Sequence, residues 1–463
     1  MQFANRALRP YIGTRAFYKD ALTVMVPVVI QQLINNLFNM VDNVMVGGLD
    51  IEGLAMSAVN VANKPYLIFF GVFFGVTGAG GLMISQYAGA RDAKTCQGLF
   101  SLQMLLGMCN AILFSCALFF FPHQIMRLFV TEEQTVALGV LYIRIVCFSY
   151  LPVSVSSTCI FALRALGKNK ISMRISIITM IINAVLNYVF IFGKLGMPQM
   201  GVEGAALGTV LSRLCEMVFY LALLFRKRMI FTTDIFAAFR LPHKVVASFA
   251  KKAIPLVVNE LFWTVGMSMY FWCYAKVDEA ALPAITVSEL LFQISAVMVM
   301  GTSSAVSVLI GTELGANELQ KARDNCKKLF SLVVVISCFC VVACIALGAV
   351  LPHAFNISVE LRQLSSQLTY TMAFFSPLAF VYGFCFFCLR AGGDTRTAAM
   401  MDGGYMWLVP VPACIYMALY LPGKISVFTA VLVVQILMNA KVFVALRVLR
   451  KGKWVRNITT IEG

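Results

Sequence analysis

The chain has 463 residues, of which 60% are hydrophobic and only 13% charged, and its mean hydropathy is +0.84. Soluble domains carry roughly 25% charged residues, so this composition excludes a soluble globular fold. The formal charge of +16 would suggest a nucleic-acid partner in a soluble protein. Here we interpret it as Lys and Arg that set membrane topology, in a chain whose hydrocarbon-facing segments exclude acids.

Continuous apolar runs of about 20 residues recur along the chain, as is typical of transmembrane helices and not of an alternating outer-membrane barrel. Residues 1–20 are basic and polar, so we expect a cytoplasmic tail. We predict an all-α polytopic membrane protein of twelve transmembrane helices near residues 22–47, 60–85, 98–121, 136–161, 171–193, 201–225, 250–275, 284–310, 328–351, 365–389, 397–420 and 425–448.

The distribution of basic residues supports this count. The segments expected inside the cell hold 29 Lys and Arg and those expected outside hold 6. Since cytoplasmic loops carry the excess of basic residues, both termini are predicted to be cytoplasmic. Arg164, Arg390 and Lys441 are counted here with the inner segments, which leaves Arg144 and Arg213 as the only Lys or Arg inside helices.

The two halves of the chain repeat. Residues 161–170, FALRALGKNK, resemble residues 387–396, FCLRAGGDTR, at an offset of 226, and Pro27 matches Pro255. We predict two pseudo-symmetric six-helix lobes, an N-lobe at 1–225 and a C-lobe at 253–463, joined by a cytoplasmic linker at 226–252. Such repeats are typical of secondary transporters that work by alternating access.

Polar side chains inside membrane helices are costly and usually mark function. The first helix carries a polar stripe that includes Gln32, Asn39 and Asp42. A carboxylate, amide oxygens and a hydroxyl suit a hard cation or a proton. The candidate ion-coupling residues are Asp42, Asn183, Asn187 and Thr209, with Na⁺ expected at Asp42, Asn183 and Thr209. Two alternatives stay open: Asp42 marks the end of the helix, and the Asn residues join helices by hydrogen bonds.

The second half offers embedded acids beside aromatic residues, which suits a lipophilic cation through ion pairing and cation–π contact. The candidate substrate-binding residues are Gln32, Asn39, Glu260, Trp263, Tyr270, Glu289, Gln293 and Tyr382. Aromatic residues also pack ordinary membrane cores, so the acids are the stronger signal. We interpret Asp402 as structural, and we expect Arg213 and Glu216 to pair because they are spaced i, i+3.

At this point the sequence resembles the multidrug and toxic compound extrusion (MATE) family over nearly its full length. The motifs that carry the resemblance are Pro27, Asp42, Val46 and Gly47 in the first helix, Tyr142–Ile145 and Leu163–Gly167 around the fourth, Asn183, Leu186, Tyr188 and Gly193 in the fifth, and Gly201–Thr209 in the sixth. The resemblance implies a V-shaped twelve-helix fold that exports organic cations and drugs against a Na⁺ or H⁺ gradient.

The resemblance also implies roles for single residues. Asp42 would be the N-lobe coupling acid, and Glu260 and Glu289 would be the C-lobe acids. Two departures matter: Asn187 stands where the family often has Asp, and the tenth helix has no acid. The first puts tight Na⁺ binding in the N-lobe in doubt, and the second leaves the C-lobe site with Glu260 and Glu289.

We therefore expect a monomeric multidrug or organic-cation antiporter in the bacterial inner membrane, coupled to Na⁺ or H⁺. It would act on small cationic amphiphiles, with the lipid bilayer around it and neither cofactor nor nucleic acid. The sequence contains no P-loop, zincin helix or nucleophile elbow, so we expect no enzyme. The alternative is a lipid-linked oligosaccharide or lipid flippase, in which Arg and Lys would hold a pyrophosphate. A major-facilitator carrier is disfavoured by the loop YAGARDAKTCQ.

Overall fold

A computed structural model describes residues 9–47, 54–130, 132–226, 231, 234–354 and 358–460, without the side chains of residues 9, 39–44, 47, 226, 235, 290–292, 294–295, 351 and 354. These residues form helices and connecting turns, with no strand among them. The α-helices are α2 Arg15–Gly47, α3 Leu54–Ala62, α4 Lys64–Gly89, α5 Ala93–Phe120, α6 Pro122–Arg127, α7 Glu133–Val146, α8 Tyr150–Ala165, α9 Asn169–Phe192, α10 Gly201–Arg226, α11 His243–Val277, α12 Leu282–Val306, α13 Thr312–Gly315, α14 Leu319–Val350, α15 Val359–Ala391, α16 Thr395–Ala399, α17 Tyr405–Leu408, α18 Pro410–Tyr420 and α19 Val427–Arg450. Short 3₁₀ segments are η1 Arg9–Tyr11, η2 Cys147–Ser149, η3 Ile235–Arg240, η4 Glu279–Ala281 and η6 Leu351–Ala354, and π-helical segments are η5 Ser307–Gly311 and η7 Met400–Gly404.

Eleven helical segments of the described chain are long and apolar enough to cross a membrane. The remaining predicted span, residues 250–275, lies in α11, which is 35 residues long. Polar residues within α11, Asn259 and Glu260 among them, lower its hydropathy and keep it out of that set. The chain is a multi-pass, all-α membrane protein, which confirms the predicted fold class.

The two halves repeat in structure as they do in sequence. The first residues of four helix pairs are 226 positions apart: Ala93 and Leu319 for α5 and α14, Glu133 and Val359 for α7 and α15, Asn169 and Thr395 for α9 and α16, and Gly201 and Val427 for α10 and α19. The starts of α2 and α11 differ by 228. Positions in these helices of the first half can therefore be matched with positions in the second half and compared residue by residue.

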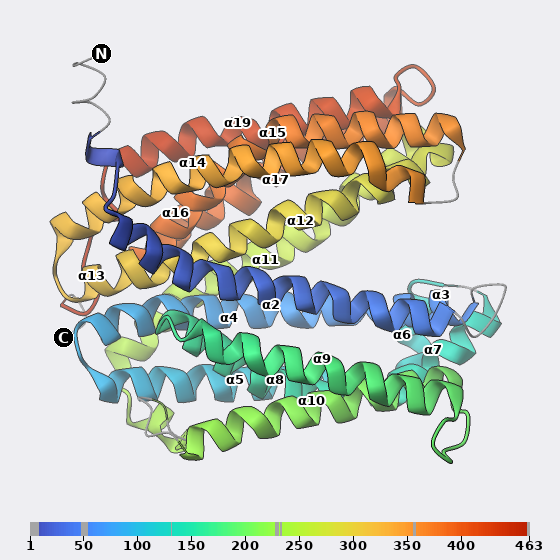
Figure 1. Cartoon of the computed structure of the whole chain (residues 1–463), viewed down its shortest axis with the longest axis horizontal. Helices are drawn as coiled ribbons and strands as arrows, with labels where there is room; N and C mark the ends of the chain where they lie inside the picture. The colour runs from blue at the N-terminus through green and yellow to red at the C-terminus, as the bar shows by residue number, and fades with distance from the viewer. Residues whose placement is uncertain are drawn as a thin grey trace. The chain divides into compact units, whose positions relative to one another are not determined.

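The described chain forms two compact units. Unit 1 comprises residues 1–29, 85–91 and 250–463, and unit 2 comprises residues 30–84 and 92–249. In unit 1, α12, α14 and α19 pack against α15, and in unit 2 α9 runs along α10 while α5 packs against α8 (Figure 1). The lobe boundaries expected from the sequence stay a prediction.

Inside unit 1, the end of α4 crosses α13 at two glycines. A Cβ on Gly89 would collide with the carbonyl oxygen of Thr312, and a Cβ on Gly315 would collide with that of Gln86. Gln86 and Thr312 are 226 positions apart, as are Gly89 and Gly315, so the contact has the symmetry of the repeat. Only glycine permits backbones to approach this closely.

The buried side chain of Gln86 adds a polar junction at this crossing. Its Nε2 donates to the carbonyl oxygen of Ala391 over 2.6 Å, and its Oε1 accepts from the backbone N–H of Ile458 over 2.9 Å. Asn457, next in the C-terminal segment, donates from Nδ2 to the carbonyl oxygen of Gly315 over 3.2 Å. One glutamine thus joins α4 to the end of α15 and to the C-terminal segment.

The predicted helix at 397–420 is not continuous. It consists of α16, the π-helical segment η7, α17 and α18, and it breaks at Val409, whose backbone angles are φ −123° and ψ −70°. Pro410 explains the break because proline lacks an N–H and disfavours helical geometry in the residue before it. The predicted helix at 136–161 is likewise divided, by η2 at residues 147–149.

Candidate functional site

Asp402 is the centre of a polar cluster in unit 1. Its Oδ1 accepts from Lys441 Nζ over 2.7 Å and from the Tyr382 hydroxyl over 3.1 Å, and its Oδ2 accepts from Asn259 Nδ2 over 3.2 Å. The Lys441 ammonium also lies over the Tyr382 ring, 4.0 Å from its centroid. Four segments, α11, α15, η7 and α19, therefore converge on one carboxylate.

Local backbone geometry aims Asp402 at its partners. Asp402 lies in η7, and π-helical turns within α-helices are frequent at functional sites. The N–H of Gly403 donates to Asn259 Oδ1 over 2.8 Å, which turns the Asn259 amide so that Nδ2 faces the carboxylate. A Cβ on Gly403 would lie 2.9 Å from Asn259 Oδ1, so glycine keeps this approach open. The Tyr405 hydroxyl donates to the carbonyl oxygen of Leu437 over 2.9 Å and fixes α17 against α19.

Glu260 follows Asn259 on α11 and is half-buried. The charged groups that act on it are Arg390 and Asp402. The Arg390 guanidinium is buried and lies over the ring of Phe386, 5.2 Å from its centroid. The helices of unit 1 thus contain two interacting acids, Asp402 and Glu260, together with the basic side chains Lys441 and Arg390.

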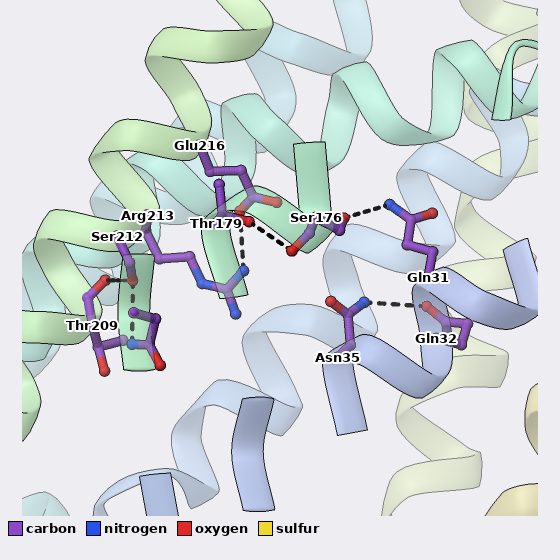
Figure 2. A network of polar contacts seen from close by, with 10 residues as sticks. Gln31, Gln32, Asn35, Ser176, Thr179, Thr209, Ser212, Arg213 and Glu216 are labelled. Carbon is purple, nitrogen blue, oxygen red and sulfur yellow. Dashed lines mark hydrogen bonds and ion pairs between the residues drawn. The ribbon is translucent and has the colours of Figure 1, made fainter. Parts of the chain in front are cut away.

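The counterpart in unit 2 is built mainly from neutral groups. Gln31 Nε2 donates to Ser176 Oγ over 3.0 Å, and Gln31 Oε1 accepts from Arg164 Nη2 over 3.0 Å. Gln32 Oε1 accepts from Arg164 over 3.4 Å. It also accepts from Asn35 Nδ2 over 3.3 Å (Figure 2). Ser176 and Asp402 are counterparts at the 226-residue offset, and Gln31 and Gln32 correspond to Asn259 and Glu260 at the 228-residue offset.

Three of the predicted ion-coupling residues lie at the junction of α9 and α10 in unit 2. Asn187 Nδ2 donates to Asn183 Oδ1 over 3.4 Å, and Asn183 Nδ2 donates to Ser212 Oγ over 3.3 Å. Ser212 donates to the carbonyl oxygen of Thr209 (Figure 2). The Thr209 hydroxyl donates to the backbone carbonyl of Ala205. These residues hold the two helices together, and an ion-coupling role for them stays a prediction.

The expected pair of Arg213 and Glu216 is confirmed. Arg213 Nη1 lies 3.0 Å from Glu216 Oε2, and Figure 2 shows the two side chains meeting along α10. The guanidinium also lies over the ring of Phe38, 4.5 Å from its centroid. The side chains of Asn39 and Asp42, which follow on α2, lie outside the described residues.

The remaining predicted substrate residues do not form one continuous face. Trp263 is exposed, whereas Tyr270 is buried in the hydrophobic core of unit 1, where its hydroxyl donates to Met438 Sδ over 3.1 Å. Glu289 is half-buried and Gln293 is exposed. Of the predicted substrate residues in the second half, Tyr382 donates a hydrogen bond to Asp402. Glu260 interacts with Asp402 through charge.

One prediction about charge was wrong. Arg144 and Arg213 are not the only basic residues inside helices, because Arg164, Arg390 and Lys441 are 8%, 6% and 7% exposed. Arg164 and Arg390 lie in the last turns of α8 and α15 and are held by groups inside their units. Lys441 lies nine residues before the end of α19, about 13 Å along the helix. Arg164 and Arg390 were assigned to loops because they lie near the ends of helices. Their burial follows from residues on other helices, which the sequence alone does not place.

Comparison with known proteins decides the family. The family model described as MatE matches residues 27–189 and again residues 255–415, so each half of the chain matches once. The chain belongs to the MatE family. Among curated relatives of this MatE chain, the "Multidrug export protein MepA" of Staphylococcus saprophyticus is 22% identical over 84% of this chain and 85% of its own. The "Probable multidrug resistance protein NorM" of Bacillus licheniformis is 23% identical over 69% of this chain and 71% of its own.

Solved structures agree on the fold. A structure described as "Crystal structure of MATE in complex with MaL6" superposes with a TM-score of 0.85 at 16% identity and covers 97% of this MatE chain and 98% of its own. A transporter from Pyrococcus furiosus, described by the reverse polarity of its binding pocket, superposes with a TM-score of 0.82 at 17% identity over 96% and 98%. At such identities the likeness establishes the MatE fold alone.

Proposed function

We propose that this MatE protein is a secondary-active exporter that moves cationic, amphiphilic small molecules of the multidrug type out of the cell. We place it in the bacterial inner membrane with both termini in the cytoplasm, coupled to Na⁺ or H⁺ entry. Family membership supports the transport class, and the names of relatives such as MepA support multidrug substrates.

The observation that carries the substrate class is the pair of acids inside unit 1. Glu260 and Asp402 lie within helices of a membrane protein; Asp402 accepts a hydrogen bond from Tyr382, and the charge of Arg390 acts on both acids. Intramembrane acids are expensive and mark substrate or ion pathways. Carboxylates beside an aromatic ring attract organic cations through ion pairing and the ring quadrupole.

Coupling would follow from mutual exclusion at acids. A proton or Na⁺ that neutralises a carboxylate removes its attraction for a cationic substrate, so ion entry favours substrate release. Asp42 stays our predicted coupling acid in the first half, together with Asn183 and Thr209. Pro27 lies inside α2 and gives this helix a site at which to bend.

The proposal is tested by ethidium transport in proteoliposomes, with a Na⁺ gradient and a pH gradient imposed separately. The native chain should transport ethidium under at least one gradient. Glu260→Gln should reduce transport strongly, and Asp42→Asn should fold but lose the response to the gradient. Glu279→Gln is the matched control, because Glu279 is exposed in η4.

The outcomes separate cleanly. Transport driven by one gradient, lost in Glu260→Gln and kept in Glu279→Gln, supports the cation exporter and names the coupling ion. Full coupled transport by Asp42→Asn would remove Asp42 from the mechanism. Absence of ethidium transport by the native chain under both gradients would contradict the proposal.

The flippase alternative deserves reconsideration because three basic side chains proved to be buried. Lys441 pairs with Asp402, and Arg390 is acted on by Glu260 and Asp402. A pyrophosphate group would have to displace Asp402 to reach Lys441, and the charges of both acids would repel it from Arg390. Arg164 faces the amides of Gln31 and Gln32, which leaves it as the one buried cation of these three that favours an anionic partner.

A further inference from the structure

The Lys441 side chain makes the contacts that a bound cation would make. Its ammonium pairs with Asp402 at 2.7 Å and lies 4.0 Å from the centroid of the Tyr382 ring. Asn259 completes the surroundings by fixing the second carboxylate oxygen. A carboxylate and an aromatic face, supplied by different helices, form a receptor for a monovalent cation.

The fold itself does not require this ion pair. At the 226-residue offset, Ser176 corresponds to Asp402 and Cys215 corresponds to Lys441. The helices α10 and α19, which carry Cys215 and Lys441, nevertheless begin at equivalent residues. A buried ion pair costs desolvation, and apolar replacements often stabilise a protein equally well. The pair in unit 1 therefore calls for a reason other than folding.

We propose that Lys441 is a tethered cation that occupies a monovalent-cation site formed by Asp402, Tyr382 and Asn259. The transported or coupling cation competes with the Lys441 ammonium for the Asp402 carboxylate. The inference rests on the proposed function and extends it by naming the group that the cation displaces. No covalent step is involved, because one cation exchanges for another.

The chemistry of lysine suits this exchange. Its charge is compact and lies at the end of a flexible four-carbon stem, so the ammonium leaves the carboxylate by rotation of side-chain bonds. The Asp402 side chain is 14% exposed, so the site is not fully closed. Return of Lys441 after the cation departs keeps the buried carboxylate compensated, which avoids the cost of an isolated charge.

The test measures equilibrium binding of ethidium to purified full-length protein in detergent, with Na⁺ as a competitor. Lys441→Gln removes the internal competitor, so ethidium should bind about tenfold more tightly, within the range expected for coupled sites. Lys451→Gln, at an exposed lysine beyond α19, is the matched control and should bind as the native chain does. The double variant Asp402→Asn/Lys441→Gln should lose the gain, because the receptor carboxylate is gone.

A merely structural ion pair would give a different result. Lys441→Gln that stays monodisperse but binds ethidium no more tightly than the native chain overturns the inference. A gain in affinity that survives in the double variant also overturns it, because Asp402 would not be the receptor.

A second variant covers the case in which Lys441→Gln does not fold. Lys441→Arg keeps the charge and offers a planar fork that holds a carboxylate more firmly, so ethidium should bind more weakly than to the native chain. Affinity equal to or above the native value in Lys441→Arg would overturn the inference. Ethidium transport by the native chain, without the expected affinity changes, leaves the proposed function standing. A native chain that transports no cation contradicts the proposed function itself.

Discussion

The two units use different side chains to join their helices at equivalent positions. In unit 2, Gln31 bridges Ser176 and Arg164, so the acceptors are an amide and a hydroxyl. At the equivalent place in unit 1, Asn259 contacts Asp402, which in turn pairs with Lys441. One repeat therefore joins its helices through neutral acceptors, and the other does so through a carboxylate.

This difference separates what packing requires from what function requires. Neutral bonds suffice to position α9 and α10, whose starts match those of α16 and α19. The acids Asp402 and Glu260 of unit 1 have no acidic counterpart at the equivalent positions of unit 2, which are Ser176 and Gln32. We therefore assign the handling of cations to the acids of unit 1, and each prediction below probes this contrast.

The largest effect is expected from breaking the ion pair. Asp402→Asn leaves the Lys441 ammonium buried without its counter-charge, which should cost about 3–5 kcal/mol of unfolding free energy. Ser176→Ala, the matched change in unit 2, removes one neutral hydrogen bond and should cost about 1 kcal/mol. Thermal and denaturant unfolding of both variants in detergent measures the two costs. Equal losses would mean that charge adds nothing to the junction of unit 1.

Packing, in contrast to charge, should respond symmetrically. Gly89→Ala and Gly315→Ala each place a methyl group against a backbone carbonyl, so each should cost about 1–3 kcal/mol of unfolding free energy. Gly81→Ala is the control, since its added Cβ meets nothing within 4 Å and a helical alanine is favoured by up to about 1 kcal/mol. The unfolding midpoints of the three variants show which substitutions destabilise the protein. A large difference between the Gly89 and Gly315 variants would contradict the symmetric crossing.

The smallest effect is expected from adding to unit 2 the charge that unit 1 carries. Gln32→Glu places a carboxylate 3.4 Å from the Arg164 guanidinium, at the counterpart of Glu260. An ion pair would replace a hydrogen bond in which only the donor is charged, and it would raise the unfolding free energy by about 1 kcal/mol. Unfolding of Gln32→Glu and of the native chain at increasing denaturant concentration measures this gain in unfolding free energy. Destabilisation as severe as that of Asp402→Asn would show that the polarity of unit 2 is not exchangeable.

Much of the fold could be predicted because its signals are local. Apolar runs located the helices. The similarity of FALRALGKNK to FCLRAGGDTR predicted two repeated halves, and the helices of the two halves begin at matching residues. Helix limits were less accurate: α14 begins at Leu319, not near 328, because its first turns are polar and lie outside the apolar run. The Arg213–Glu216 pair was predictable from its i, i+3 spacing.

The cluster of unit 1 could not be predicted in the same way. Asp402 was interpreted as structural because it lies near the start of the predicted eleventh helix, where it could reach water, and Lys441 was counted with the C-terminal segment. Neither has a charged partner on its own helix that would have indicated the pair. Their pairing spans 39 positions and depends on how η7 and α19 pack. The π-helical turn that aims Asp402 has no sequence signal beyond Gly403 and Gly404, which favour irregular backbone without specifying it.

The central claim is that cations are bound by the acids of unit 1. Its most direct test is equilibrium binding of ethidium to the purified native chain, to Glu260→Gln and to Ser176→Ala. We expect Glu260→Gln to bind about tenfold more weakly, a loss of roughly 1.4 kcal/mol, and Ser176→Ala to bind as the native chain does. Loss of binding in Ser176→Ala, with native affinity in Glu260→Gln, would contradict the claim and move the cation site to unit 2.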